Sequence, residues 1–362
     1  MELFRLDEFR NRIDIVDSYH SLIWTERWNT PGEWKLVIES TPANRARFIQ
    51  DSIWVLNDSY HPMILQTIED TVDVEGRPML TITGRSLLQL LDQRVLIGIE
   101  SVGVVAQKMH FENTPAAILR EIFNMVCVLG WVDVHDGDFL GAGSTLPLGD
   151  IPEYPGVIVK DYEPASLLTI FTEMAQAYDF GCRVVCVEPS NEFKFDIYTG
   201  FDRTSAQTNN PAVIFSPNLD NLQNTSELKS TAIEKNVAYV YAEQGYAFVY
   251  APGIPQWQQG FARKVMVVHV TDEPKDNPTA RQAYLEQKGR EALAVNRAYS
   301  AFDGEIVKNS QYRYGIDYYL GDLVEMQNED GYQKKMRVTE QIFISDAEGE
   351  RTYPTLSESP LS

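Results

Sequence analysis

The sequence predicts a β-rich α+β fold in which two similar small β-barrel or sandwich domains flank an α+β middle domain. Three observations support this fold class: strands separated by turns fill the first part of the chain, two helix-strand units follow, and strands return around one helix. The chain has 362 residues, which is more than one hydrophobic core usually organises. We therefore expect domains at 1–97, 98–212 and 213–362.

The first domain reads as a series of half-buried strands. Apolar and polar residues alternate in 34–39 and 80–83, as a strand with one buried face requires. Pro31-Gly32 and the sequence at 75–78 supply turns between strands. The expected strands are 12–18, 22–28, 33–40, 52–57, 63–73 and 79–83. In 86–94 the leucines change to helical spacing, which predicts a short helix at the end of this domain.

The middle domain contains the same helix pattern twice. Pro115 and Pro164 each stand where the first turn of a helix needs no N–H, and apolar residues follow at helical spacing. Gly130 and Gly181 stand where these helices should end. We expect a strand after each helix, with strands at 182–187 and 192–199. Residues 137–156 predict a long surface loop, and the polar run 202–211 predicts a linker.

The last domain predicts a second β module interrupted by a helix. Strands are expected at 237–241, 247–250 and 264–270, and the helix formers of 278–298 follow Asn277, a good N-cap residue. After Asp303-Gly304 we expect strands at 318–327 and 334–344, joined by a hairpin turn at 329–331.

Charge and cysteine content exclude several classes of protein. The chain has 52 acidic and 31 basic side chains and a formal net charge of -21. Such a surface should repel nucleic acid and anionic membranes. Cys127, Cys182 and Cys186 are too few for a disulfide framework and predict reduced, buried thiols. The sequence shows neither a signal peptide nor a membrane-spanning segment, so we expect synthesis in the cytoplasm.

No catalytic, cofactor-binding or metal-binding residue is predicted. The five histidines, His20, His61, His110, His135 and His269, show no metal-ligand spacing. The acidic turn 133–138 could collect oxygen ligands for calcium, but it lacks the EF-hand spacing and is better explained as a solvated turn. The 182–186 CxxxC pattern fits core thiols, and Gly141-Ala142-Gly143 lacks the strand, helix and third glycine of a dinucleotide site.

Three stretches carry a resemblance to a known family. They are 83–94, with Gly84-Arg85-Ser86 before a leucine-rich helix; 216–222, with 235–240 downstream; and 314–324, with Gly321-Asp322 near its end. Together and in this order they resemble the tail-hub proteins of siphophages, the baseplate-hub or tail-associated family, whose counterpart in contractile phages caps the tail tube. Their Gly-Arg-Ser and Gly-Asp residues are interpreted as turn and packing positions.

The resemblance implies a structural virion protein at the tail tip. It implies a homotrimeric ring between a hexameric tail tube, or a distal tail protein, and a fibre or spike. Other minor tail proteins and the tape-measure protein would be its neighbours. Two similar barrels in each of three chains would present six near-equivalent faces to the tube. DNA would only pass through the lumen during genome ejection, since an acidic wall offers it no binding site. Because the sequence ends at Ser362, we expect no lytic domain here.

Two other classes of function stay open. A virion-associated, cell-wall-degrading enzyme would need a cleft with a carboxylate pair or a metal. A carbohydrate- or receptor-binding tail protein would need exposed aromatic side chains. The tryptophans from which such a platform could be drawn are Trp24, Trp28, Trp34, Trp54, Trp131 and Trp257.

Overall fold

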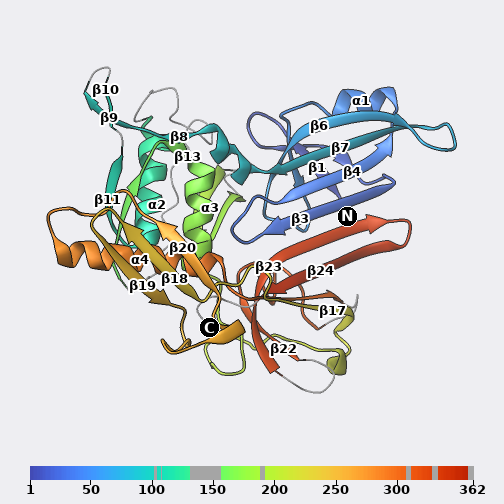
Figure 1. The fold of residues 1–362 in the computed structure, drawn as a ribbon. Helices are drawn as coiled ribbons and strands as arrows, with labels where there is room; N and C mark the ends of the chain where they lie inside the picture. The colour runs from blue at the N-terminus through green and yellow to red at the C-terminus, as the bar shows by residue number, and fades with distance from the viewer. Residues whose placement is uncertain are drawn as a thin grey trace.

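The computed structural model describes residues 1–101, 104–106, 108–130, 156–187, 192–306, 311–327 and 333–357. The acidic turn 133–138, Trp131, Gly141-Ala142-Gly143, nearly all of the expected loop 137–156 and the expected turn 329–331 lie outside these residues. The described part is a β-rich α+β structure (Figure 1), as the sequence predicts.

The first β module consists of β1–β7 and one short helix. Its elements are β1 Leu3–Leu6, β2 Arg12–Val16, β3 Ser21–Arg27, β4 Glu33–Glu39, α1 Pro42–Arg47, β5 Ile53–Leu56, β6 Met63–Val72 and β7 Pro78–Ser86. The six predicted strands are confirmed to within three residues at each end, whereas β1 and α1 were not predicted. The predicted helix at 86–94 is a 3₁₀ helix, Leu87–Gln93.

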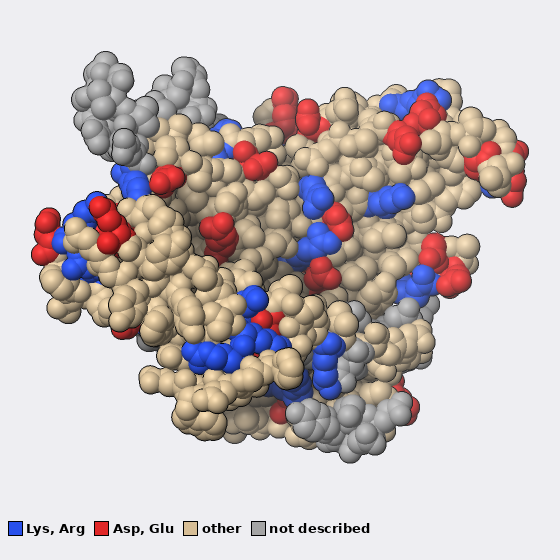
Figure 2. Space-filling view, in the orientation of Figure 1, with Lys and Arg blue, Asp and Glu red and all other residues tan. Residues whose placement is uncertain are grey.

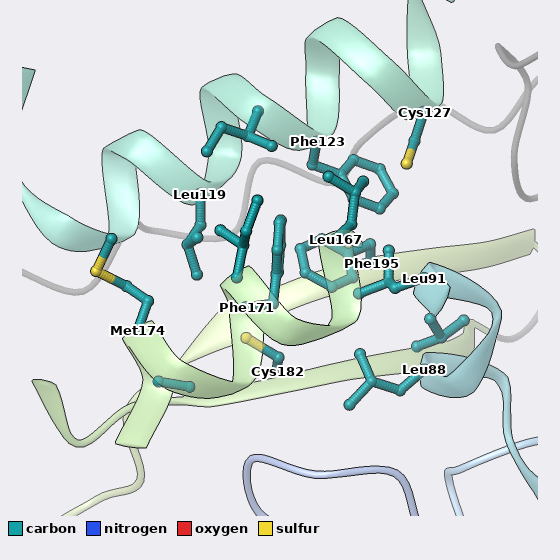
Figure 3. Close-up of a cluster of buried hydrophobic side chains, with 14 of the residues drawn as sticks. Leu88, Leu91, Leu119, Phe123, Cys127, Leu167, Phe171, Met174, Cys182 and Phe195 are labelled. Carbon is teal, nitrogen blue, oxygen red and sulfur yellow. The ribbon is translucent and has the colours of Figure 1, made fainter. Parts of the chain in front are cut away.

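The middle part packs two helices against short strand pairs. Its elements are β8 Val95–Leu96, β9 Gly98–Ser101, β10 Val104–Ala106, β11 Met109–Asn113, α2 Pro115–Phe123 with one π-helical turn Asn124–Val128, β12 Ile158–Tyr162, β13 Ala165–Ser166, α3 Leu167–Tyr178, β14 Gly181–Val187 and β15 Glu192–Tyr198. Figure 3 shows its core, where Phe123 of α2, Phe171 of α3 and Phe195 of β15 meet. The Phe123 and Phe195 rings stack at 4.3 Å.

Two predicted helix boundaries in this part are wrong. Pro164 does not begin α3, because Ala165 and Ser166 first pair with β8 and the helix starts at Leu167. The helix ends at Asp179, whose φ of 55° stops it two residues before Gly181. By contrast, Pro115 does begin α2, and Gly130, with a φ of 58°, follows its last turn.

The second β module is split by an insert. The module consists of β16 Ile214–Phe215, β17 Leu222–Ser230, β21 Tyr299–Ile306, β22 Leu323–Gln327, β23 Gln333–Asp346 and β24 Gly349–Ser357. The insert consists of β18 Val237–Ala242, β19 Gly245–Tyr250, β20 Val265–His269 and α4 Pro278–Val295. Two 3₁₀ turns complete this half of the chain, Pro217–Leu219 and Gly260–Ala262.

Several predictions hold here and three need correction. Asn277 caps α4, since its Oδ1 accepts from the Thr279 and Ala280 N–H groups at 3.0 and 3.1 Å. Asp303-Gly304 is no break, because both residues lie inside β21. The strand expected from 318 begins only at Leu323, after a turn. The run 202–211 is no free linker, because Arg203 and Thr204 are buried against the second module.

The two β modules form one continuous sheet of thirteen strands, joined where β3 pairs antiparallel with β23. They are therefore not separate bodies on either side of the middle part, and Phe343 of β23 lies in the core of the first module. The division into domains at 97 and 212 stays a prediction.

Candidate assembly surfaces

The long path through the sheet contains two sets of four strands in the same order. Along the sheet the strands run β17-β21-β24-β23 and then β3-β4-β7-β6. Numbered by their order in the chain, each set has the order 1-2-4-3. In both sets neighbouring strands are antiparallel.

The third strands of the two sets, β6 and β23, also match in detail. Each has an irregularity in register part of the way along, between Leu65 and Thr67 in β6 and between Val338 and Glu340 in β23. In the part of each strand before this irregularity, β6 pairs with β5 and β23 pairs with β22. After it, β23 pairs with β3, whereas β6 from Thr67 to Val72 has only β7 as a neighbour among the described strands.

The described sheet therefore has two open edges along these eight strands. One is the outer half of β6, where all residues from Thr67 to Val72 except Ile68 are exposed. The other is β17, which pairs only with β21 and whose described side chains from Gln223 to Lys229 are exposed. Unpaired N–H and C=O groups on such edges are templates for pairing with another chain.

A junction around Trp28 fixes the modules relative to one another. Trp28 follows β3, is 2% exposed, and belongs to the core of the second module. Its ring makes an edge contact with Tyr198 of β15 at 4.7 Å, and the Arg337 guanidinium of β23 lies 5.1 Å from it. Gly321, with a φ of 91°, leaves the space that the indole fills, because a Cβ there would lie 1.8 Å from the ring.

Polar groups are buried beside Trp28. Glu26 is fully buried, and its carboxylate accepts hydrogen bonds from the Ser59 and Tyr314 hydroxyls. Burial raises the pKa of Tyr314 well above its ordinary value, so the phenol stays a donor. His61 Nε2 lies 4.0 Å from Glu26, yet burial lowers the pKa of His61. In the same region Arg183 stacks 3.9 Å from the centre of the Tyr198 ring.

Two buried ion pairs complete the junction. Arg337 of β23 pairs with Asp179, the residue that ends α3, at 2.7 Å. Arg203 pairs with Asp322 at 2.6 Å, and the Phe201 and Tyr319 N–H groups also donate to Asp322. Burial nevertheless raises the pKa of Asp322. The desolvation of these charges therefore opposes their attraction, and their main effect is to fix which surfaces meet.

The insert is attached to the middle part through α4. Glu291 of α4 pairs with Lys160 of β12 and accepts from the Tyr178 hydroxyl at 2.6 Å. Burial raises the pKa of Glu291, but Lys160 and the hydrogen bonds outweigh it, so the pKa is lowered and the pair stays ionised. Gln287 adds hydrogen bonds to the Val159 backbone at 3.0 and 3.4 Å.

The residues considered for chemistry from the sequence do not come together. The three cysteines, all within the described residues, form no disulfide; Cys127 and Cys182 are buried and Cys186 is partly buried. Burial also raises the pKa of Cys182, which makes it a poor nucleophile. In the described ranges no group of three or more His, Cys, Asp or Glu residues could hold a metal ion. That the protein has no catalytic residue stays a prediction.

The tryptophan platform is largely ruled out within the described chain. Trp24, Trp28, Trp34 and Trp54 are at most 2% exposed, while Trp257 is 76% exposed. Half of the described tyrosine and phenylalanine side chains that are exposed belong to the insert, namely Tyr241, Tyr246, Phe248 and Phe261, and the sequence did not single them out. Figure 2 shows acidic and basic side chains interspersed on the visible face. No described helix is long and apolar enough to cross a membrane.

Comparison with known proteins agrees with this architecture. The family model of the siphovirus ReqiPepy6 Gp37-like protein matches residues 1–356. No curated protein sequence matches the chain.

Among solved structures, the fold resembles a tail protein from Neisseria meningitidis MC58 (TM-score 0.57, 12% identity, 99% of this chain and 96% of that chain). It also resembles the 43 kDa tail protein of prophage MuSo2 from Shewanella oneidensis (TM-score 0.58, 13% identity, 99% and 97%). A third similar structure is the prophage tail protein gp18 from Listeria monocytogenes EGD-e (TM-score 0.51, 13% identity, 100% and 96%). The resemblance to siphophage tail proteins is thereby confirmed. The chain belongs to the siphovirus Gp37-like protein family and has the fold of bacteriophage tail proteins over nearly its whole length.

Proposed function

We propose that this chain is the hub of a siphophage tail tip, a structural virion protein that forms a homotrimeric ring. The ring joins the hexameric tail tube to a fibre or spike and lets DNA pass. One observation carries the proposal: two sets of four strands with the same order lie side by side in one sheet, and each set has a strand edge without a described partner, at β17 and at the outer half of β6.

The joint within the chain supplies a template for the joint between chains. Inside the chain, the last part of β23 pairs with β3, the first strand of the next set. The outer half of β6 is the equivalent of that part of β23, and β17 is the equivalent of β3. Pairing β6 of one copy with β17 of the next would repeat the internal joint. This contact is head-to-tail, and a head-to-tail contact forms a ring when the rotation between copies closes, as a threefold rotation does after three copies.

The repeat also explains why three copies suit a sixfold partner. Three chains with two equivalent strand sets each give six similar units around the ring, so a hexameric tube end meets six comparable surfaces. The net charge of -21 supports a passage for DNA rather than a binding site, because phosphates find few cations to neutralise them.

The decisive experiment measures mass and symmetry. Mass photometry of the purified chain should give about three times the 41.2 kDa of the chain, and image averages should show a threefold ring. A particle of one or two chains at all concentrations would contradict the ring.

A proline in the free edge tests the joint itself. The Asp73 N–H donates to Arg77 O within the β6–β7 hairpin at 2.9 Å, so the N–H of the preceding Val72 points away from β7. Val72→Pro should therefore leave the hairpin intact and weaken the trimer at least tenfold. Val74→Pro, in the fully exposed turn of the same hairpin, is the control and should change nothing.

A further inference from the structure

The insert has a three-stranded sheet with one covered and one open face. Helix α4 packs on the covered face, where Ala238, Val240, Ala247 and Val249 are buried. On the other face, cross-strand registers place nine side chains in three rows: Tyr246, Tyr241 and His269; Phe248, Tyr239 and Val267; Tyr250, Val237 and Val265. We call these nine residues the aromatic face. It contains six rings and no carboxylate.

The first two rows of the aromatic face reach the surface and are held in place by ring contacts, whereas Val237 in the third row is fully buried. Tyr246, Phe248 and Val267 are 66%, 54% and 63% exposed. The Phe248 ring lies 4.8 Å from that of Tyr239 and 5.2 Å from that of Tyr246, and Tyr241 stacks on His269 at 4.6 Å. Figure 2 shows few charged side chains over β18, β19 and β20. The surface is thus apolar and ordered by its own packing.

A loop beside the sheet extends this surface. Arg263 ties the loop to the face, because its guanidinium donates to Gln258 O at 3.3 Å and to the Tyr239 hydroxyl at 3.2 Å. Trp257 and Phe261 of this loop are exposed. With typical side-chain areas, the exposed aromatic rings of face and loop amount to on the order of 700 Å². That exceeds the largest apolar patch of most monomers, about 300–600 Å².

We propose that the aromatic face packs against the next copy of this chain in the ring. This inference rests on the proposed function and adds a second contact between subunits to the β6–β17 joint. The area argues for it, since one partner of a stable interface contributes about 800 Å².

Charge also favours a second copy as the occupant. Every copy has a net charge of -21, so copies repel each other over most of their surface. Contact between copies costs least where carboxylates are scarce, and the aromatic face has none. A basic partner would instead be drawn to the acidic surface elsewhere. Arg263 at the margin of the face could in addition attract an acidic neighbour.

The chain path brings this face next to the proposed joint. Strand β17 ends at Ser230 and β18 begins at Val237, so only six residues separate the free edge from the insert. Leu228 of β17 and Ile233 of the connection are exposed apolar side chains in this stretch. A copy that pairs with β17 must therefore lie close to the insert.

The test compares oligomer stability in two variants. In the triple variant Tyr246→Ser, Phe248→Ser and Val267→Ser, only outward-facing side chains change, so circular dichroism should stay that of the wild type. Dilution followed by mass photometry should show trimers that dissociate at a concentration at least 100-fold higher than the wild type. Val74→Ser, at an exposed hairpin turn far along the chain from the insert, should behave as the wild type.

A photoreactive phenylalanine analogue at position 248 gives a readout independent of stability. Irradiation of the purified chain should link two copies, and the linked peptide should come from the same sequence. If the triple variant keeps wild-type trimers and position 248 forms no link between copies, this inference fails while the ring stands. If the triple variant instead loses only binding to cell-wall polysaccharide, the face is a carbohydrate site and the inference is also wrong. A monomeric wild type would overturn the ring itself.

Discussion

The core of the first β module and the junction around Trp28 are both closed to solvent, but they are built from different chemistry. In the core, the Phe48 ring stacks on that of Trp54 and the Trp34 ring is tilted against it, with ring centres 4.7 and 6.1 Å from that of Trp54, among aliphatic side chains. At the junction, Glu26, Arg337 and other ionisable side chains lie beside a single indole.

The two regions therefore have different roles: the core contributes stability, and the junction determines how the modules are placed relative to one another. Burial of apolar area in the core contributes about 25 cal/mol per Å² and favours any compact arrangement of the strands. Buried charges at the junction contribute little net stability, but a wrong arrangement would leave them without partners. We infer that the core holds the sheet together, whereas the junction sets the angle between modules, on which the proposed ring would depend.

The largest expected effects come from the two tryptophans. Trp54→Ala and Trp28→Ala should each lower the free energy of unfolding by about 3–5 kcal/mol, because each removes a buried aromatic side chain. They should differ in cooperativity. Trp28 contacts the middle part and both modules, so its loss should split the calorimetric transition in two, while Trp54→Ala should keep one transition at lower temperature. A single transition in both variants would remove the distinction between core and junction.

Gly321→Ala should have the next largest effect. It should lower the free energy of unfolding by about 2–4 kcal/mol, because it strains a left-handed backbone and brings a Cβ into the Trp28 ring. Gly76→Ala separates these two causes, since Gly76 has a similar φ of 82° but open space around it. Urea denaturation of both variants measures the difference. Equal losses would show that the indole does not need the space at Gly321.

Acid should weaken the junction through His61. Because burial lowers the folded-state pKa of His61, the unfolded chain takes up a proton first as the pH falls below about 6.5, the ordinary histidine pKa. Stability should therefore fall with pH in that range, by at most about 1.4 kcal/mol per pH unit.

His61→Gln should flatten this slope in denaturation curves measured between pH 7 and pH 5. His20→Gln, at an exposed position, controls for the substitution. If the slope is unchanged in His61→Gln, other groups cause the acid sensitivity.

The sequence was sufficient for the core but not for the surfaces that matter for assembly. Strands with one buried face, such as β4 and β7, alternate clearly; β4 was located to within one residue at each end and β7 to within three. Strand β17 was missed because most of its described side chains are exposed on both faces, so it shows no alternation. Strand β24 was missed because Pro354 and polar residues interrupt its pattern. Free edges lack the very signal by which strands are recognised.

The junction could not be predicted for a different reason. Trp28 is far from Gly321 and Arg337 in the chain, and each of the three fits an ordinary strand or turn when considered alone. In the insert, strands β18 and β19 could be predicted, but their exposed face could not. Only the position of α4 decides that Tyr241 and Tyr246 face outward.

The smallest effect on the free energy of unfolding is expected from an ion pair at the surface, where the two modules meet. Arg27 of β3 donates to Glu340 of β23 and to Glu33 of β4, both at 2.7 Å, and so spans the joint between the two strand sets. These side chains are partly exposed, so Arg27→Met should reduce the free energy of unfolding by only about 0.5–1 kcal/mol in low salt, and by less at 1 M salt. Arg27→Lys keeps the charge but cannot bind both carboxylates with one planar group, so it should recover only part of the loss. If Arg27→Met matched Trp28→Ala in size, the joint and not the buried junction would hold the modules together.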